Sequence, residues 1–169
     1  MKDEKVFIIA EMSANHGNDI EVAKETIRAA KRAGADAIKL QTYKPETITL
    51  NHKSDDFLIK TGGVGDGTYL YDLYKEAHLP WEWHQDLFNL AKEEQIICFS
   101  SPFDFSAVDL LEKLNSPIYK IASYEITDIP LIKYVASKSK PVIISTGCAT
   151  FKDIELAIST IRAEKNNDI

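Results

Sequence analysis

Five short apolar runs, separated by amphipathic segments, are the feature that most limits how this chain can fold. The runs are rich in Ile, Val and aromatic residues, and several are apolar at consecutive positions, as strands buried on both faces are. We expect strands at residues 6–10, 37–41, 96–100, 118–122 and 141–145. We expect helices at residues 20–33, 81–94, 104–114, 129–137 and 151–161. Repeated β–α units predict a parallel sheet joined by right-handed crossovers.

Two architectures contain five such units. One is a flavodoxin-like open sheet, which is complete at about this length, and the other is the first five units of a (β/α)8 TIM barrel of about 250 residues. Polar residues at or just past the predicted strand ends bear on this choice: they are Glu11, Gln41, Ser100, Ser101, Ser123, Ser145 and Thr146. One polar cluster on every strand end fits a barrel mouth better than a single crevice. We therefore predict an α/β chain in which residues 1–169 form a partial TIM barrel.

The connection after the second predicted strand is unusually long. Residues 42–79 contain four of the seven glycines of the chain, at positions 62, 63, 65 and 67. A loop of this length in a compact domain usually has a functional role. We expect it to lie over the carboxyl ends of the strands, as a lid or a binding loop.

The composition and the apolar pattern argue against several kinds of partner and against a membrane span. Twenty basic against 26 acidic residues give a net charge of −6, which disfavours nucleic acid or an anionic membrane as the main partner. No apolar run approaches the roughly 18 residues of a membrane span, and the first residues do not resemble a signal peptide. Cys98 and Cys148 lack the spacing of a zinc or redox motif. We expect both to be buried reduced thiols in a cytoplasmic protein.

Two lysines within apolar strands are the sharpest candidates for binding. Lys39 and Lys120 each lie among apolar neighbours, where an ammonium group is costly unless it meets an anion. Two of them at one barrel mouth would suit a phosphate or a carboxylate. Ser101, Ser123 and Ser145 could donate hydroxyl hydrogen bonds in the same layer. The alternatives are an edge strand that exposes its lysine and serines that serve as caps or turn residues.

A carboxylate ends the first predicted strand. Glu11 could act as an acid or base, or it could form a salt bridge with one of the two lysines. His16, in the loop that follows, is more typical of a structural histidine than of a catalytic one. His52, His78 and His84 have no spacing that is typical of metal ligands, so we predict no metal site within this chain.

Five collinear stretches resemble the N-terminal barrel of the sialic acid synthase family. They are residues 8–17 (IIAEMSANHG), 34–42 (GADAIKLQT), 99–103 (FSSPF), 119–125 (YKIASYE) and 140–147 (KPVIISTG). Each stretch is weak alone, but five in order are specific. Residues 40–43 (LQTY), 56–60 (DFLIK), 71–75 (YDLYK) and 83–84 (WH) most resemble the pseudaminic acid synthase branch.

The resemblance implies a reaction and roles for the candidate residues. Members of the family condense phosphoenolpyruvate with an N-acetylated amino sugar and release phosphate. By position, the residues that would hold phosphoenolpyruvate are Lys39, Ser101, Lys120, Ser123 and Ser145. Gln41 and Glu11 would lie on the sugar side, and Glu11 would handle the proton of the attacking water. A divalent metal, Mn²⁺ or Mg²⁺, polarises the sugar aldehyde in the full-length family, whose members form homodimers.

The chain also departs from the family pattern. The resemblance implies further βα units and a C-terminal antifreeze-like domain that are absent here, together with metal ligands on the later strands. We expect a truncated chain that carries the phosphoenolpyruvate half of the site. The alternatives are N-acetylneuraminate synthase, with the same chemistry on another sugar, and a non-catalytic fragment that binds phosphate ligands.

Overall fold

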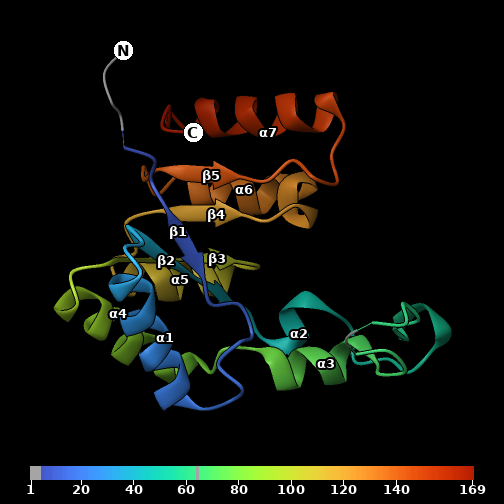
Figure 1. Cartoon of the computed structure of the whole chain (residues 1–169). Coiled ribbons are helices and arrows are strands. Elements are labelled where there is room, and N and C mark those ends of the chain that lie inside the picture. The colour runs from blue at the N-terminus through green and yellow to red at the C-terminus, as the bar shows by residue number, and fades with distance from the viewer. Residues whose placement is uncertain (1–4, 64) are drawn as a thin grey trace.

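A computed structural model describes residues 5–63 and 65–169 of the chain (Figure 1). Its strands are β1 (Ile9–Glu11), β2 (Ala37–Thr42), β3 (Ile97–Pro102), β4 (Tyr119–Ile121) and β5 (Val142–Ile144). All neighbours pair in parallel, and their order in the sheet is their order in the chain. The flavodoxin-like alternative needs a point where the strand order reverses, so it is wrong. Consecutive order is the arrangement of a (β/α)8 barrel.

Five helices connect and cover the strands. They are α1 (Ile20–Arg32), α4 (His84–Glu93), α5 (Phe105–Lys113), α6 (Ile129–Ala136) and α7 (Phe151–Ala163), and they lie on the outer side of the curved sheet (Figure 1). Side-chain caps fix where four of them begin: Asp19, Asp104, Asp128 and Thr150 each accept a hydrogen bond from a backbone N–H of the first turn. Within the described residues, no helix is long and apolar enough to cross a membrane.

The core is divided into two clusters of buried side chains. One joins β1, β2 and β3 to α1 and α4, with Ile27, Leu40 and Leu87 among its members. The other joins β4 and β5 to α5, α6 and α7 around Ile121. Phe88 of α4 packs against both clusters. Each fully buried aliphatic side chain contributes about 1.5–3 kcal/mol, so each cluster can stabilise its own half of the sheet.

Three local expectations are wrong. The first strand begins at Ile9 rather than at residue 6, because Asp36 instead takes the Ile8 N–H at 2.8 Å and leaves Val6 exposed. The helix expected at residues 81–94 is split into a 3-10 turn, Trp81–Trp83, followed by α4. Cys98 is buried, but Cys148 is exposed in the loop after β5; both are free thiols.

Residues 42–79 contain more regular structure than the expected loop. They form α2 (Pro45–Ile48), a 3-10 turn at Asp55–Phe57 and α3 (Leu70–Ala77). An isolated antiparallel bridge between Leu58 and Tyr69 closes the part between the last two. The segment leaves the carboxyl end of β2 and extends beyond the strand ends (Figure 1). Its role as a lid stays a prediction.

Candidate functional site

Lys39 and Glu11 form an ion pair across the first two strands. The register places Glu11 opposite Lys39, and the Lys39 Nζ lies 2.5 Å from Glu11 Oε2. The other oxygen, Oε1, accepts hydrogen bonds from Ser13 N at 3.1 Å and from Ser13 Oγ at 2.9 Å. Of the two alternatives for Glu11, the salt bridge is present in the structure. This pairing also orients the carboxylate, so an acid–base role for Glu11 stays a prediction.

Lys120 lies near this pair, but no carboxylate of residues 5–63 or 65–169 forms an ion pair with it. Its Nζ donates to the backbone oxygen of Ile121 at 3.0 Å. Burial lowers the pKa of Lys120, and the positive charge of Lys39 lowers it further, while Glu11 and Glu125 act in the opposite direction. The structure therefore brings both lysines to one region. A second positive charge beside a half-buried ammonium group is unfavourable until an anion arrives.

Gln41 and Ser101 continue the same face of the sheet. Gln41 lies opposite Ser101, and it is two residues after Lys39, so their side chains point to the same side. The pairing of Ser100 with Tyr119 places Ser101 level with Lys120 on the next strand. Ser101 is 1% exposed, and its Oγ has no hydrogen-bond partner among the described residues. A buried hydroxyl without a partner is a free donor for a bound ligand.

Ser123 and Ser145 follow the ends of β4 and β5. The Ser145 N–H donates to Ile121 O at 3.0 Å, which extends the pairing of the two strands by one step. A Cβ placed on Gly147 would lie 3.2 Å from Ser123 Oγ, so the backbone of Gly147 passes close to this hydroxyl. A side chain at position 147 would crowd Ser123, whereas glycine leaves its hydroxyl accessible.

Glu125 was missed by the sequence analysis. It lies in the 3-10 turn Tyr124–Thr127 directly after β4, and its Oε2 is buried without a hydrogen-bond partner among the described residues. Burial raises the pKa of Glu125, the nearby Asp128 raises it further, and Lys120 lowers it. A carboxyl group with a raised pKa can both release and accept a proton. The sequence places Glu125 two residues after the candidate Ser123, which could have marked it as a candidate. That it lies near Lys120 follows only from the 3-10 turn, which the sequence does not indicate.

His52 and His78 pack or hydrogen-bond within the fold, whereas the buried Nε2 of His16 has no hydrogen-bond partner among the described residues. His16 is buried, its Nδ1 accepts from Asn18 N at 3.1 Å, and burial lowers its pKa. His52 packs edge-on against Phe57, and His78 Nδ1 bonds to Lys75 O at 2.9 Å. Across residues 5–63 and 65–169, no group of three or more His, Cys, Asp or Glu side chains is arranged to hold a metal ion. The residues described do not fit a divalent metal.

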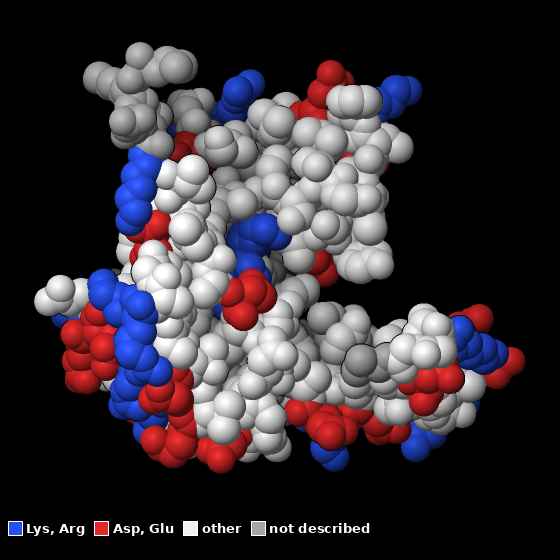
Figure 2. Space-filling model, in the orientation of Figure 1, with Lys and Arg blue, Asp and Glu red and all other residues white. Residues whose placement is uncertain are grey.

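The candidate residues share one face of the sheet where β1, β2 and β3 meet β4 and β5, and the space-filling view shows a hollow on the face turned to the reader (Figure 2). Basic and acidic side chains meet in this hollow, whereas much of the surrounding surface on this face is uncharged (Figure 2). The six side chains brought to this end of the sheet are Glu11, Lys39, Gln41, Ser101, Lys120 and Ser145, with Ser123 beside them. Two ammonium groups with several hydroxyl donors are suited to a ligand that carries two anionic groups.

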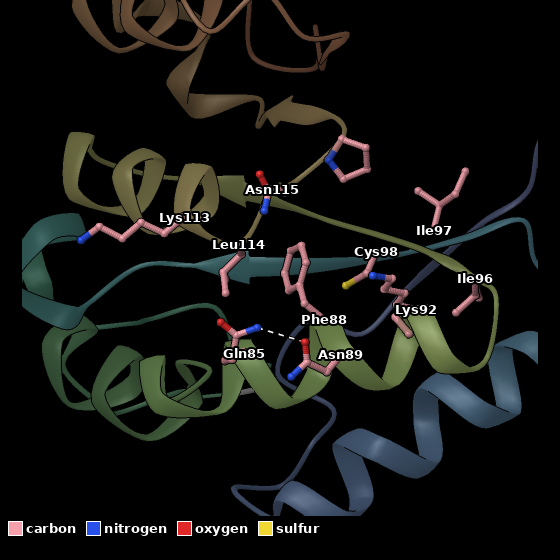
Figure 3. A pocket seen from close by; sticks show the side chains of 12 residues that line it. Gln85, Phe88, Asn89, Lys92, Ile96, Ile97, Cys98, Lys113, Leu114 and Asn115 are labelled. Carbon is pink, nitrogen blue, oxygen red and sulfur yellow. Dashed lines mark hydrogen bonds between the residues drawn. The ribbon is translucent and has the colours of Figure 1, made fainter.

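A separate groove lies on the outer side of the sheet. It is bounded by α4 and the chain from α5 to β4, with Phe88 and Leu114 in its wall and Cys98 at its base (Figure 3). Its cavity volume is about 450 Å³. Gln85 donates to Asn89 at 3.0 Å, so these two amides partly satisfy each other. None of the candidate residues lines this groove, so it is not part of the proposed anion site.

Comparison with known proteins gives consistent results. The sequence profile of the NeuB family matches residues 26–169. The chain is 48% identical over 167 residues to a pseudaminic acid synthase of Campylobacter jejuni subsp. jejuni serotype O:2, covering 99% of this chain and 48% of that protein. It is 50% identical over 162 residues to a pseudaminic acid synthase of Helicobacter pylori, covering 96% of this chain and 47% of that protein.

Solved structures confirm the fold. The chain superposes with a TM-score of 0.82 on an N-acetylneuraminic acid synthetase of Leptospira borgpetersenii serovar Hardjo-bovis, crystallised in complex with citrate. That match has 31% identity and covers 96% of this chain and 52% of that protein. The prediction of a partial TIM barrel is therefore confirmed. The chain spans about half the length of the curated relatives that it matches.

Proposed function

This chain belongs to the NeuB family, and from that premise we propose that it binds phosphoenolpyruvate as part of a nonulosonic acid synthase. The observation that carries the proposal is the convergence of Lys39 and Lys120 on one face at the strand ends, with the unpartnered Ser101 hydroxyl on β3, the strand between them, in register with Gln41 and level with Lys120. Phosphoenolpyruvate carries a phosphate and a carboxylate, which match two ammonium groups in number and sign.

In the proposed reaction, C3 of phosphoenolpyruvate attacks the aldehyde carbon of an open-chain amino sugar. Water adds at C2, and the resulting tetrahedral carbon expels phosphate with cleavage of the C2–O bond. The lysines and the hydroxyls of Ser101, Ser123 and Ser145 would hold the two anionic groups and stabilise the charge on the departing phosphate. The water proton needs an acceptor. Glu11 is the proposed one, because its carboxylate is held in place by Lys39 and Ser13.

The proposed second substrate is a 2,4-diacetamido or other N-acetylamino sugar. Gln41 supports this assignment, because its half-buried amide can both donate to and accept from sugar groups beside the anion site. The identity to two pseudaminic acid synthases favours the product pseudaminic acid over N-acetylneuraminic acid. A divalent metal and a homodimer, as the resemblance implies, stay proposals for the full-length family; the described residues offer no metal site, and we assign no step to a metal.

The test is the binding of phosphoenolpyruvate to the 169-residue chain by isothermal titration calorimetry. We expect Lys120→Ala to weaken binding by about 1.5–3 kcal/mol, or roughly tenfold to a hundredfold, because one charged partner is lost. The matched control is Lys152→Ala, which removes an exposed lysine of α7 and changes the net charge equally. Equal affinities for the two variants would contradict the proposed site.

A second measurement separates binding from turnover. The chain is incubated with phosphoenolpyruvate, the amino sugar and Mn²⁺, and phosphate release is followed. We expect no sugar-dependent release by the chain alone, because the described residues supply only the anion-binding part of the site. Release well above that of Lys120→Ala would show that the chain, alone or by self-assembly, carries a complete site.

A further inference from the structure

A buried chain of three hydrogen-bonding side chains lies directly behind the candidate site. His84, the first residue of α4, bonds through Nε2 to Thr42 Oγ1 at 2.9 Å. Thr42 Oγ1 in turn lies 2.7 Å from Ser100 Oγ. All three residues are fully buried. Neither the family resemblance nor the proposed chemistry uses this group, which we call the Thr42–His84–Ser100 relay.

The direction of each hydrogen bond follows from the far end of the imidazole. His84 Nδ1 lies 3.1 Å from the carbonyl oxygen of Pro80, which can only accept, so Nδ1 carries the proton. Nε2 of the neutral ring then accepts from the Thr42 hydroxyl. Because Thr42 has only one proton to give, Ser100 must donate to Thr42. Along this path, from the Pro80 oxygen through His84 and Thr42 to Ser100, every polar side-chain atom therefore has a hydrogen-bond partner. Only one placement of the protons satisfies all of these bonds.

The relay residues alternate with residues of the site. Thr42 directly follows Gln41 on β2, and Ser100 directly precedes Ser101 on β3. Because neighbouring side chains of a strand point to opposite faces, Thr42 and Ser100 point toward α4 while Gln41 and Ser101 point toward the hollow. The relay thus ties the last residues of two strands to one rigid helix.

We propose that the Thr42–His84–Ser100 relay is a positioning device. It holds the side chains of Gln41 and Ser101 in the position and orientation needed to bind phosphoenolpyruvate, and the proposal rests on the proposed function. Thr42 lies at the carboxyl end of β2, where the strand pairs with β3 only and leads straight into the segment 42–79. Without the relay this end has one fewer fixed contact, and the side chains that it carries can shift. Displacements of about 1 Å at a binding group can cost roughly a hundredfold in function.

The main test compares phosphoenolpyruvate affinity in Thr42→Val and in a matched control. Valine has the shape of threonine but cannot bond to His84 or Ser100, and we expect about tenfold weaker binding. Ser100→Ala, which removes only the terminal donor, is the milder second variant should Thr42→Val not fold. The control is Tyr119→Phe, which removes the partly buried hydrogen bond from the Tyr119 hydroxyl to Glu112 on α5 but keeps the backbone pairing of Tyr119 with Ser100 and all three side chains of the relay. We expect unchanged affinity in this control at a temperature where every variant is fully folded.

Rescue by a conservative variant separates positioning from general stability. In His84→Gln the side-chain amide can still accept from Thr42, whereas His84→Phe fills similar space without an acceptor. We expect His84→Gln to keep most of the affinity and His84→Phe to lose about as much as Thr42→Val, even where their melting temperatures are equal. In wild type, the ¹⁵N chemical shifts of His84 should report a proton on Nδ1.

The outcomes are distinguishable. If wild type binds and Thr42→Val or Ser100→Ala binds equally well, the positioning proposal is overturned and the proposed function stands. If wild type does not bind phosphoenolpyruvate, the proposed function fails, and hydrogen exchange of the Gln41 and Ser101 amides decides on the relay. Exchange about tenfold faster in the relay variants than in Tyr119→Phe supports positioning, and equal exchange overturns it.

Discussion

The two halves of the sheet hold one lysine each, and they hold it differently. In the half built from β1, β2 and β3, Lys39 is neutralised by Glu11 at 2.5 Å. In the half built from β4 and β5, the partner of Lys120 within the described part of the chain is a backbone carbonyl, and its pKa is lowered by burial and by Lys39. Under the proposed function, Lys39 shares its charge between Glu11 and the ligand, whereas the charge of Lys120 is matched chiefly by the ligand.

The halves also differ in how firmly they are built. Strands β2 and β3 pair over six residues, whereas β3 and β4 meet through one registered pair, Ser100 with Tyr119. Each half has its own buried cluster, and Phe88 packs against both. The proposed anion site therefore extends across the short contact between β3 and β4, which we call the seam, and this seam joins two parts that each have their own buried cluster. Its geometry depends on what holds that seam closed.

Phe88→Ala should have the largest effect on this arrangement. Truncation of a core Phe costs about 3–5 kcal/mol, and we expect about 3 kcal/mol because Phe88 is half-buried. Since its ring joins the two clusters, we also expect the halves to unfold separately, so that hydrogen exchange across β4 and β5 no longer matches that across β2. Urea unfolding followed by tryptophan fluorescence and by exchange would show two transitions.

The control for this variant is Phe105→Ala. Phe105 is 50% exposed and packs edge-on against Tyr134 of α6. We expect a smaller loss of stability and one cooperative transition. A single transition in Phe88→Ala as well would mean that the seam does not depend on this ring.

His84 should make the first half the acid-sensitive one. Burial lowers the pKa of His84 to about 4, against 6.5 in an exposed chain, while Glu82 acts to raise it and His78 to lower it further. As the pH falls from about 6.5 to about 4, the unfolded chain binds a proton that the folded chain does not. The free energy of unfolding therefore falls by about 3 kcal/mol from this group.

The measurement is urea unfolding of wild type and His84→Gln at pH 7 and at pH 4.5. The glutamine does not titrate, so the variant should lose less stability on acidification than wild type. Carboxylates contribute equally to both proteins and cancel in the difference. All four histidines precede β3 in the chain, so β4 and β5 have no counterpart of this effect. Parallel pH dependence in the two proteins would contradict the neutral, buried state of His84.

Much of this organisation could be predicted from the sequence, for identifiable reasons. Short apolar runs alternating with amphipathic segments indicate parallel strands, and parallel strands bring their carboxyl ends together, so Lys39 and Lys120 could be expected at one end of the sheet. The face to which each side chain points follows from register, which only the structure supplies. That is why Ser100 and Ser101 were grouped together although they point to opposite sides.

The missed features depend on contacts between distant parts of the chain. Glu125 approaches Lys120 because a 3-10 turn follows β4, and a single turn has little sequence signature. His84 had no recognisable partner, because Thr42 and Ser100 are 42 and 16 residues away and become neighbours only when the sheet forms. Helix α2 was overlooked because four residues carry no periodic pattern, and α3 was overlooked because its eight residues, none of which is fully buried, form only a short one.

Replacing Lys39 or Lys120 by methionine tests the difference between the two halves directly. The expected changes in the free energy of unfolding are the smallest considered, and they have opposite signs. Lys39→Met leaves Glu11 without its cation and should lower the free energy of unfolding by about 1 kcal/mol. Lys120→Met removes a half-buried charge that has no carboxylate partner among the residues that the structure describes, so it should raise stability by about 1 kcal/mol. Because the folded chain binds the Lys120 proton less tightly than the unfolded chain, wild type should gain stability as the pH rises toward 10.5, and Lys120→Met should lack that gain.

Adding Glu11→Gln to both variants completes the test: it should abolish the loss of stability caused by Lys39→Met and leave the gain caused by Lys120→Met nearly unchanged. If Lys39→Met and Lys120→Met lowered the free energy of unfolding equally, Lys120 would be stabilised by its surroundings as strongly as Lys39 is by Glu11. The inferred difference between the two halves of the sheet would then be wrong.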